Sequence, residues 1–120
     1  MREIKFRAWH KNRKTFLDFD WAVDKLGRVF SILDKCVYDE FTDEIELMQY
    51  TGLKDMTGRD IYEGDVVEFE VSLIRTKAEV KYSRNQFIVS RNSVMPRSLD
   101  LYLVKIIGNI FENPELLEAD

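Results

Sequence analysis

The stretch Ile61-Tyr62-Glu63-Gly64-Asp65-Val66-Val67-Glu68-Phe69-Glu70-Val71 decides the fold class of this 120-residue chain. Its second half alternates apolar and acidic residues, a period of two that is typical of a β-strand with one buried face. Gly64 and Asp65, just before the strand, are residue types that favour a chain reversal. The stretch therefore predicts a turn followed by a strand, and the same rhythm recurs along most of the chain.

The other expected strands lie on both sides of this stretch. Alternating or apolar runs predict strands at 4–9, 16–19, 29–33, 44–50, 78–82, 87–89 and 99–107. Residues 83–86 have the composition of a hairpin turn, 72–77 of a loop, and the proline at 96 is expected to interrupt the pattern. The segment 34–44 is compatible with a strand or with a loop that holds one helical turn. Asn113 followed by Pro114 predicts a short C-terminal helix.

Strands joined by short polar turns predict an all-β or β-rich fold with antiparallel strands. Residues 62–107 hold about four of the strands, which is the size of an SH3-like small barrel. We therefore expect one compact unit with a β-rich subdomain at 1–50 and a barrel with a C-terminal helical turn at 51–120.

Composition narrows the class of protein further. The chain has 18 basic and 22 acidic residues, a net charge of −4, and 45% hydrophobic residues, enough for one core. No apolar run reaches the ~20 residues of a membrane span, and one cysteine excludes an internal disulfide and a multi-cysteine metal site. These features indicate a small cytosolic protein that does not bind membranes.

The charge is arranged in blocks. Residues 1–16 and 75–97 each hold six bases and one acid, whereas the segments between and after them are acidic. Either the blocks neutralise each other, or the two basic blocks form one surface for an acidic partner or a phosphate backbone. The candidate nucleic-acid-binding residues are Lys77, Lys81, Arg84, Arg91 and Arg97. The alternation places Tyr82 and Phe87 in the core rather than on a surface that stacks on bases.

Six residues are expected to shape turns rather than to carry chemistry: Gly52, Asp55, Gly58, Gly64, Asp65 and Gly108. No catalytic constellation is evident, because His10 and Cys36 are the single histidine and cysteine and no nucleophile motif surrounds either. We expect His10 at the surface or a strand end and Cys36 as a small buried residue. The carboxylates of 60–65 are the best place for a divalent cation, but they follow no known loop pattern. No phosphate-binding loop is present, so no cofactor and no resident metal are expected.

Three segments resemble the YopX family, small proteins of bacteriophages and prophages. They are Ile4 to Trp9, the run from Met48 to Val67 with its Gly52, Asp55 and Gly58, and the closing run from Ile107 to Leu117. The resemblance implies a β-rich fold with an SH3-like barrel in the second half, and the cytoplasm of an infected or lysogenic bacterial cell. It implies no activity and supplies no catalytic residues.

Three functions are compatible with the sequence. The first is a non-enzymatic module that binds a protein partner or itself through exposed sheet edges. The second is a nucleic-acid-binding barrel that uses the basic hairpin. The third, which the residues support least, is a metal-assisted hydrolase.

Overall fold

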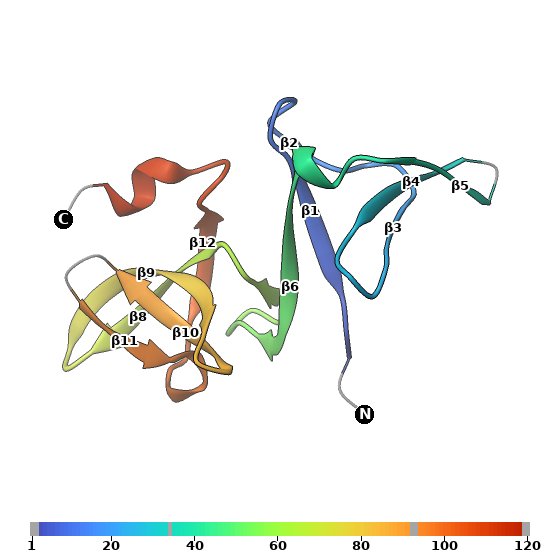
Figure 1. Ribbon diagram of the computed structural model, residues 1–120. Helices are drawn as coiled ribbons and strands as arrows, with labels where there is room; N and C mark the ends of the chain where they lie inside the picture. Colours follow the sequence, from blue (N-terminus) through green and yellow to red (C-terminus); the bar gives the residue numbers. More distant parts are fainter. Residues whose placement is uncertain (1–2, 34, 92–93, 119–120) are drawn as a thin grey trace. The chain divides into compact units, whose positions relative to one another are not determined.

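The computed structural model describes residues 3–33, 35–91 and 94–118, and it divides into two compact units (Figure 1). Unit 1 comprises residues 1–6 and 48–120, and unit 2 comprises residues 7–47. The sequence-based division, 1–50 and 51–120, differs in two respects. The observed boundary lies inside a strand at 47/48, and the first six residues join the C-terminal unit.

Unit 1 is built on one antiparallel sheet that curls into a half-barrel (Figure 1). Its strand order is β11 (Val94–Ser98), β10 (Gln86–Arg91), β9 (Ile74–Ser83), β8 (Asp65–Val71) and β12 (Lys105–Asn109). The unit also holds β7 (Asp60–Tyr62), which pairs with the later part of β6 (Ile45–Lys54), and the 3₁₀ helices η2 (Leu99–Leu101) and η3 (Pro114–Leu117). The alternation of β8 and β9 fills the core. Val67, Phe69, Ala78 and Val80 are buried together with Ile106.

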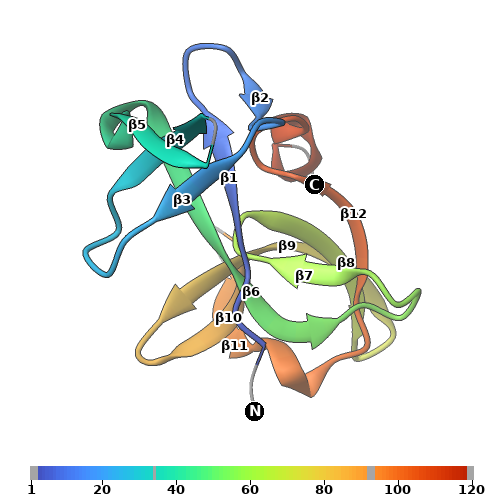
Figure 2. The same cartoon turned by 90° about the vertical axis from the view of Figure 1, so that its right-hand side faces the viewer.

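Unit 2 contains a three-stranded antiparallel sheet in the order β3 (Trp21–Val23), β4 (Val29–Leu33) and β5 (Cys36–Glu40), visible in Figure 2. It also contains β1 (Phe6–His10), which pairs with β2 (Thr15–Phe16), the 3₁₀ helix η1 (Thr42–Glu44) and the start of β6. Its core is small. Ala8, Val29 and Ile45 are buried, and Leu17, Trp21, Phe41 and Leu47 pack against them.

The expected antiparallel, β-rich fold is confirmed, and several segments differ from the expected elements. Among the described residues after 34, Cys36–Glu40 form β5 and Thr42–Glu44 form η1, so both structures that the sequence of this segment allowed are present. β1 begins at Phe6 and not at residue 4, so Ile4 lies before the strand and is 62% exposed, whereas Trp9 within the strand is buried.

The expected loop at 72–77 is wrong, because β9 already begins at Ile74. Ser72 and Leu73 both have positive φ angles, 51° and 69°, and they form a two-residue connection between β8 and β9. Hairpins of this kind favour Asn and Gly at these positions. Ser72 and Leu73 therefore give no turn signal, and the end of β8 and the start of β9 cannot be recognised from the sequence.

The expected interruption at Pro96 and the expected strand from Leu99 are also wrong. Pro96 lies within β11, an edge strand of the sheet, where a missing N–H is tolerated. Residues 99–101 form η2, and the final strand begins at Lys105. The C-terminal helix is one 3₁₀ turn, η3. No helix among the described residues is long and apolar enough to cross a membrane.

Candidate functional site

The turn at residues 55–58 is organised by the carboxylate of Asp55, which is 6% exposed. Its Oδ1 accepts hydrogen bonds from the Thr57 N–H (2.9 Å), the Thr57 hydroxyl (2.7 Å) and the Arg59 N–H (2.9 Å). Its Oδ2 accepts the Ile106 N–H of β12 at 3.0 Å. Burial alone raises the pKa of Asp55, but these hydrogen bonds outweigh it and lower the pKa to about 2. Asp55 thus fastens the turn to β12 as a carboxylate.

Other predicted turn residues also have structural roles. Gly52, Gly58 and Gly64 all have φ angles near +90°, where a glycine is favoured. The Asp65 carboxylate accepts the Tyr62 N–H at 2.8 Å and closes the reversal before β8. Gly108 is required for a different reason. A Cβ there would lie 2.6 Å from Asn113 Oδ1 and 2.7 Å from Leu116 Cδ1.

The carboxylates of 60–65 already have partners in the protein: Glu63 accepts the Gln49 N–H, Asp65 accepts the Tyr62 N–H, and Asp60 is held by lysines. Asp60 accepts hydrogen bonds from both Lys5 and Lys54 at 2.5 Å, and these lysines lower its pKa to about 2. Among the described residues, no group of three or more acidic, histidine or cysteine side chains is placed to hold a metal ion.

The candidate nucleic-acid residues on β9 lie among acids. In the register of the sheet, Glu68 of β8 stands opposite Lys77, and Glu70 stands opposite Arg75. Arg75 bonds Glu68 at 2.7 Å, and Lys81 approaches Glu79 at 3.9 Å. The basic block of the sequence is therefore interleaved with carboxylates from the neighbouring strand and from β9 itself.

The remaining candidates are spread over other places. Arg97 stands opposite the buried Val89, and it donates to the Tyr102 hydroxyl at 3.2 Å. Val89 pairs with Val80 of β9, so Arg97 lies on the opposite face of the sheet from Lys77 and Lys81. Arg84 is at the tip of the β9–β10 hairpin, with a φ of 51°. Arg91 ends β10, and its side chain lies outside the described part of the structure.

The aromatic pair of this hairpin differs from its expected placement. Tyr82 is 54% exposed, so its assignment to the core is wrong, whereas Phe87 packs against the core. The two rings lie edge to face, with their centroids 5.1 Å apart. Tyr82 is exposed because it lies at the end of β9, next to the hairpin turn.

The single histidine is buried at the end of β1, so the strand-end location is confirmed. The Arg13 N–H donates to Nδ1 at 3.1 Å, and Nε2 lies 3.3 Å from Glu44 Oε2. His10 and Ser31 both line a small hollow of about 190 Å³. Both ring nitrogens of His10 are already engaged, so His10 is not arranged as a general base for the Ser31 hydroxyl.

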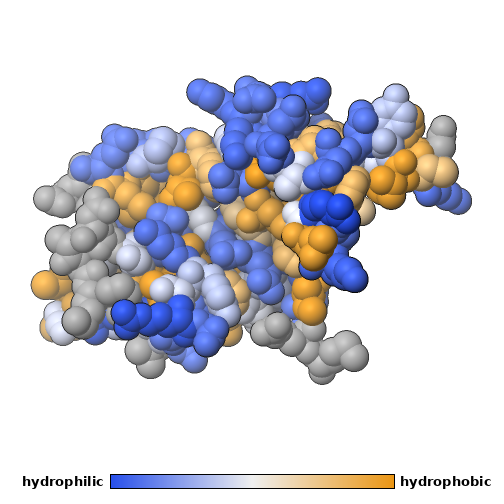
Figure 3. All heavy atoms as spheres, viewed as in Figure 1, coloured by the Kyte–Doolittle hydropathy of each residue, from blue (hydrophilic) through white to orange (hydrophobic). Residues whose placement is uncertain are grey.

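An exposed apolar patch lies on the β4–β5 hairpin of unit 2. The patch consists of Leu33, Cys36, Val37 and Tyr38, and we call it the hairpin patch. Leu33, Val37 and Tyr38 are 56%, 63% and 68% exposed. Cys36 is exposed as well, so its expected burial is wrong. Figure 3, in the orientation of Figure 1, shows hydrophobic atoms at the surface over β4 and β5.

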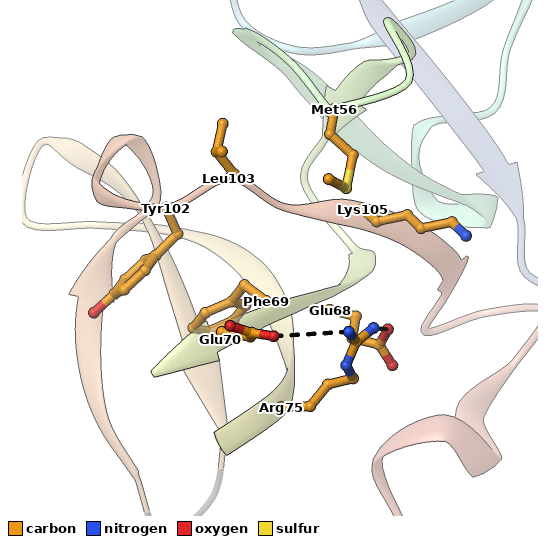
Figure 4. A pocket seen from close by; sticks show the side chains of 8 residues that line it. All are labelled: Met56, Glu68, Phe69, Glu70, Arg75, Tyr102, Leu103 and Lys105. Carbon is orange, nitrogen blue, oxygen red and sulfur yellow. Dashed lines mark hydrogen bonds and ion pairs between the residues drawn. The ribbon is translucent and has the colours of Figure 1, made fainter. Parts of the chain in front are cut away.

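The second candidate is a cleft of about 460 Å³ on unit 1. Figure 4 shows its lining residues, which are Met56, Glu68, Phe69, Glu70, Arg75, Tyr102, Leu103 and Lys105. The rings of Phe69 and Tyr102 stack with centroids 4.7 Å apart. Met56 and Leu103 are 61% and 81% exposed. No sequence pattern pointed to this cleft, because it joins residues from the 55–58 turn, β8, β9 and the segment before β12.

Comparison with known proteins gives the family. The family described as YopX protein matches residues 5–118. The chain belongs to the YopX family. No curated protein matches the chain.

Two solved structures resemble this YopX-family chain over nearly its whole length. Protein EF1440 from Enterococcus faecalis has 25% sequence identity and a TM-score of 0.68. Protein yopX from Bacillus subtilis has 20% identity and a TM-score of 0.66, a likeness of fold. In each comparison the match covers 98% of this chain and 99% of the other. The YopX-like runs identified in the sequence include the Asp55 turn and the end of β12 from Ile107, the residue after the Ile106 N–H that Asp55 accepts.

Proposed function

We propose that the protein is a non-enzymatic binding module that recognises another protein through the hairpin patch. The observation that carries the proposal is the exposure of Leu33, Val37 and Tyr38, three large apolar side chains of one short hairpin. Single exposed apolar residues are common on protein surfaces, but an exposed group of them marks an interaction site. The patch also holds the exposed Cys36, opposite Leu33 in the register of the hairpin.

The edge of the sheet supports the same proposal. β5 pairs with β4 on one side, and no other described strand pairs with its second side. Ile32 donates its N–H to Asp20 on the β3 side, so the backbone groups of Val37, which stands opposite Ile32, point to the open edge. A register shift between Phe30 and Ile32 interrupts the ladder. A bulge shortens the stretch that a partner strand can pair with, so side chains would supply most of the contact.

Cys36 allows a direct test with the natural residue. A maleimide photo-crosslinker on Cys36 is expected to join the protein to its partner, or to a second copy, in a lysate of the producing bacterium. The double substitution Val37→Ser and Tyr38→Ser should abolish the crosslink, because it removes the apolar contact and leaves both cores intact. Leu26→Ser is the matched control, since Leu26 is 70% exposed on another turn of unit 2.

Light scattering of the purified protein separates self-association from binding of a different protein. A strict monomer whose crosslinks are the same with and without the double substitution refutes the proposal. Crosslinks from Cys36 to nucleic acid in place of protein would likewise refute the proposal.

The biological origin of the protein and its location in the cell are part of the same proposal. A phage or prophage origin and a location in the bacterial cytoplasm are supported by the family resemblance and by bacterial proteins with this fold. Expression during induction of a lysogen, followed by fractionation of the cells, tests both.

A further inference from the structure

The loop between β1 and β2, residues 11–14, is closed by the side chain of the residue before it (Figure 2). The Arg13 N–H donates to His10 Nδ1 at 3.1 Å, although the loop is exposed and the imidazole is buried. A side-chain acceptor at the start of a turn is usually an oxygen of Asp, Asn, Ser or Thr. Here an imidazole nitrogen has this role, and imidazole is the side chain that ordinarily gains a proton between pH 5 and 8.

The contacts of His10 fix where the hydrogen lies in its neutral ring. Nδ1 accepts a backbone N–H, so it carries a lone pair and no hydrogen. The hydrogen is therefore on Nε2, which lies 3.3 Å from Glu44 Oε2. A second proton can bind only at Nδ1. The imidazolium would then direct an N–H at the Arg13 N–H, and two donors cannot form a hydrogen bond with each other.

The charged groups around the ring decide which side of this contact moves. Glu44 and Asp39 contribute carboxylates to the hollow beside His10, Arg13 contributes a guanidinium, and the other lining residues are uncharged. Protonation turns the contact between Nε2 and Glu44 into an ion pair, which holds the charged ring in place. Arg13 has the same charge as the imidazolium. The ring therefore stays, and the exposed loop moves.

The rest of the loop is held by contacts that do not involve the imidazole. The Lys14 N–H donates to the His10 carbonyl at 2.8 Å, and the Lys11 N–H donates to the Glu44 carbonyl at 2.9 Å. On the side of β6, the Lys11 ammonium lies 3.7 Å from a carboxylate oxygen of Glu46. The change on protonation is therefore confined to the tip of the loop, and β1 and β2 stay paired.

We infer that His10 is a pH-sensitive latch for the loop between β1 and β2. The neutral imidazole holds the tip of the loop at the strand end, and the imidazolium releases it. The released tip carries Arg13 and Lys14, neither of which has an ion pair within the described residues. Acidification therefore converts a fixed basic loop into a mobile one beside a newly charged ring. The inference rests on contacts of one side chain and is independent of the hairpin patch.

NMR of ¹⁵N-labelled protein between pH 5 and 8 tests the latch. At pH 8 the ring nitrogens of His10 should show a hydrogen on Nε2 and none on Nδ1. On acidification the ring signals and the Arg13 amide should shift with one common midpoint. After correction for the intrinsic effect of pH on exchange, the Arg13 amide should lose protection roughly two- to ten-fold, the change expected for one hydrogen bond.

Two substitutions separate the roles of the two nitrogens. His10→Asn places an amide oxygen near the position of Nδ1, an acceptor that does not titrate, so its Arg13 amide should stay protected at both ends of the pH range. His10→Gln places its amide near the position of Nε2 and lacks the acceptor, so its Arg13 amide should be unprotected throughout. The Leu26 amide, which donates to Asp24 Oδ1 in another turn of unit 2, is the internal control and should not follow the midpoint of the ring.

The wild-type titration decides the outcome without any substitution. The inference is overturned if His10 does not titrate between pH 5 and 8, if its neutral ring carries hydrogen on Nδ1, or if the Arg13 amide does not follow the ring. An Arg13 amide that still titrates in His10→Asn also overturns it. Melting temperatures at pH 8 check that both variants fold. None of these results bears on crosslinking from Cys36, so failure here and failure of the hairpin patch are distinguishable.

Discussion

Replacing Asp55 by Asn should destabilise the protein in a pH-dependent way. The substitution keeps the shape of the side chain but removes its charge. The carboxylate accepts four hydrogen bonds, so the amide must direct its NH₂ group at one or more N–H or O–H donors in either orientation. A buried donor left without an acceptor costs at least about 1 kcal/mol.

The lowered pKa of Asp55 gives the second contribution to the loss of unfolding free energy. The native state lowers the pKa of Asp55 from 3.8 to about 2, and one pKa unit corresponds to about 1.36 kcal/mol. Because the folded pKa is lower than the unfolded one, the charge stabilises the native state above pH 4, and this contribution is lost as the pH falls through 2. Ionisation therefore contributes about 2 kcal/mol at neutral pH, about half of that at pH 3, and little at pH 2.

Urea denaturation of both proteins between pH 2.5 and 7 measures the difference. The free energy of unfolding of Asp55→Asn should be about 3 kcal/mol lower at pH 7, and the difference should narrow toward about 1 kcal/mol at the acid end. The other carboxylates titrate equally in both proteins, so their contributions cancel in the difference between the two free energies of unfolding. A difference that is below 1 kcal/mol at pH 7, or that stays constant with pH, would falsify the role assigned to Asp55.

Asp60→Asn is the matched control. Its carboxylate also has a pKa of about 2, but the side chains of its partners Lys5 and Lys54 are 35% and 57% exposed to solvent. Salt screens exposed ion pairs far more than buried hydrogen bonds. The effect of Asp60→Asn should therefore shrink in 1 M NaCl, whereas the effect of Asp55→Asn should persist.

Three further substitutions test the packing of unit 1. Gly108→Ala should lower the free energy of unfolding by about 1–3 kcal/mol in thermal melts, because its Cβ would lie within 2.7 Å of Asn113 and Leu116; an unchanged melting temperature would contradict this contact. An added Cβ at Gly58 would have open space, but the φ angle there is +91°. Gly58→Ala should therefore lower the free energy of unfolding by about 1–2 kcal/mol through backbone strain alone. A stabilised variant would exclude a left-handed residue at this position. Val80→Ala should cost about 1–3 kcal/mol by urea denaturation, since Val80 is fully buried in the half-barrel, whereas the same change at an exposed site should cost little; equal effects at both sites would argue against this core.

Much of the local structure was predictable from sequence because strands and turns have local causes. The alternation at Val66–Val71 fixes a strand whatever its neighbours are. Asp55 and Gly58 define a turn by short-range hydrogen bonding and by a positive φ. The connection at Ser72–Leu73 escaped prediction because its backbone is left-handed without the residues that usually signal this.

The candidate sites depend on pairing between distant segments, and this pairing is not written in local periodicity. The register of β8 against β9 places Glu68 opposite Lys77 and converts a basic block into a mixed surface. The register of β10 against β11 puts Arg97 on the other face, because a shift of one residue reverses every side chain. The cleft beside Met56 likewise exists because β12 joins the sheet next to β8.

The sequence by itself determined the class of fold, the main turns and the membership of one family, since these follow from period, turn chemistry and motif order along the chain. Only the tertiary structure decided which apolar residues are left exposed and which charges remain available. Leu33, Val37 and Tyr38 have the composition of core residues, yet they lie on a hairpin at the edge of a three-stranded sheet. Burial depends on what covers a side chain, and in this protein the covering elements come from distant parts of the chain.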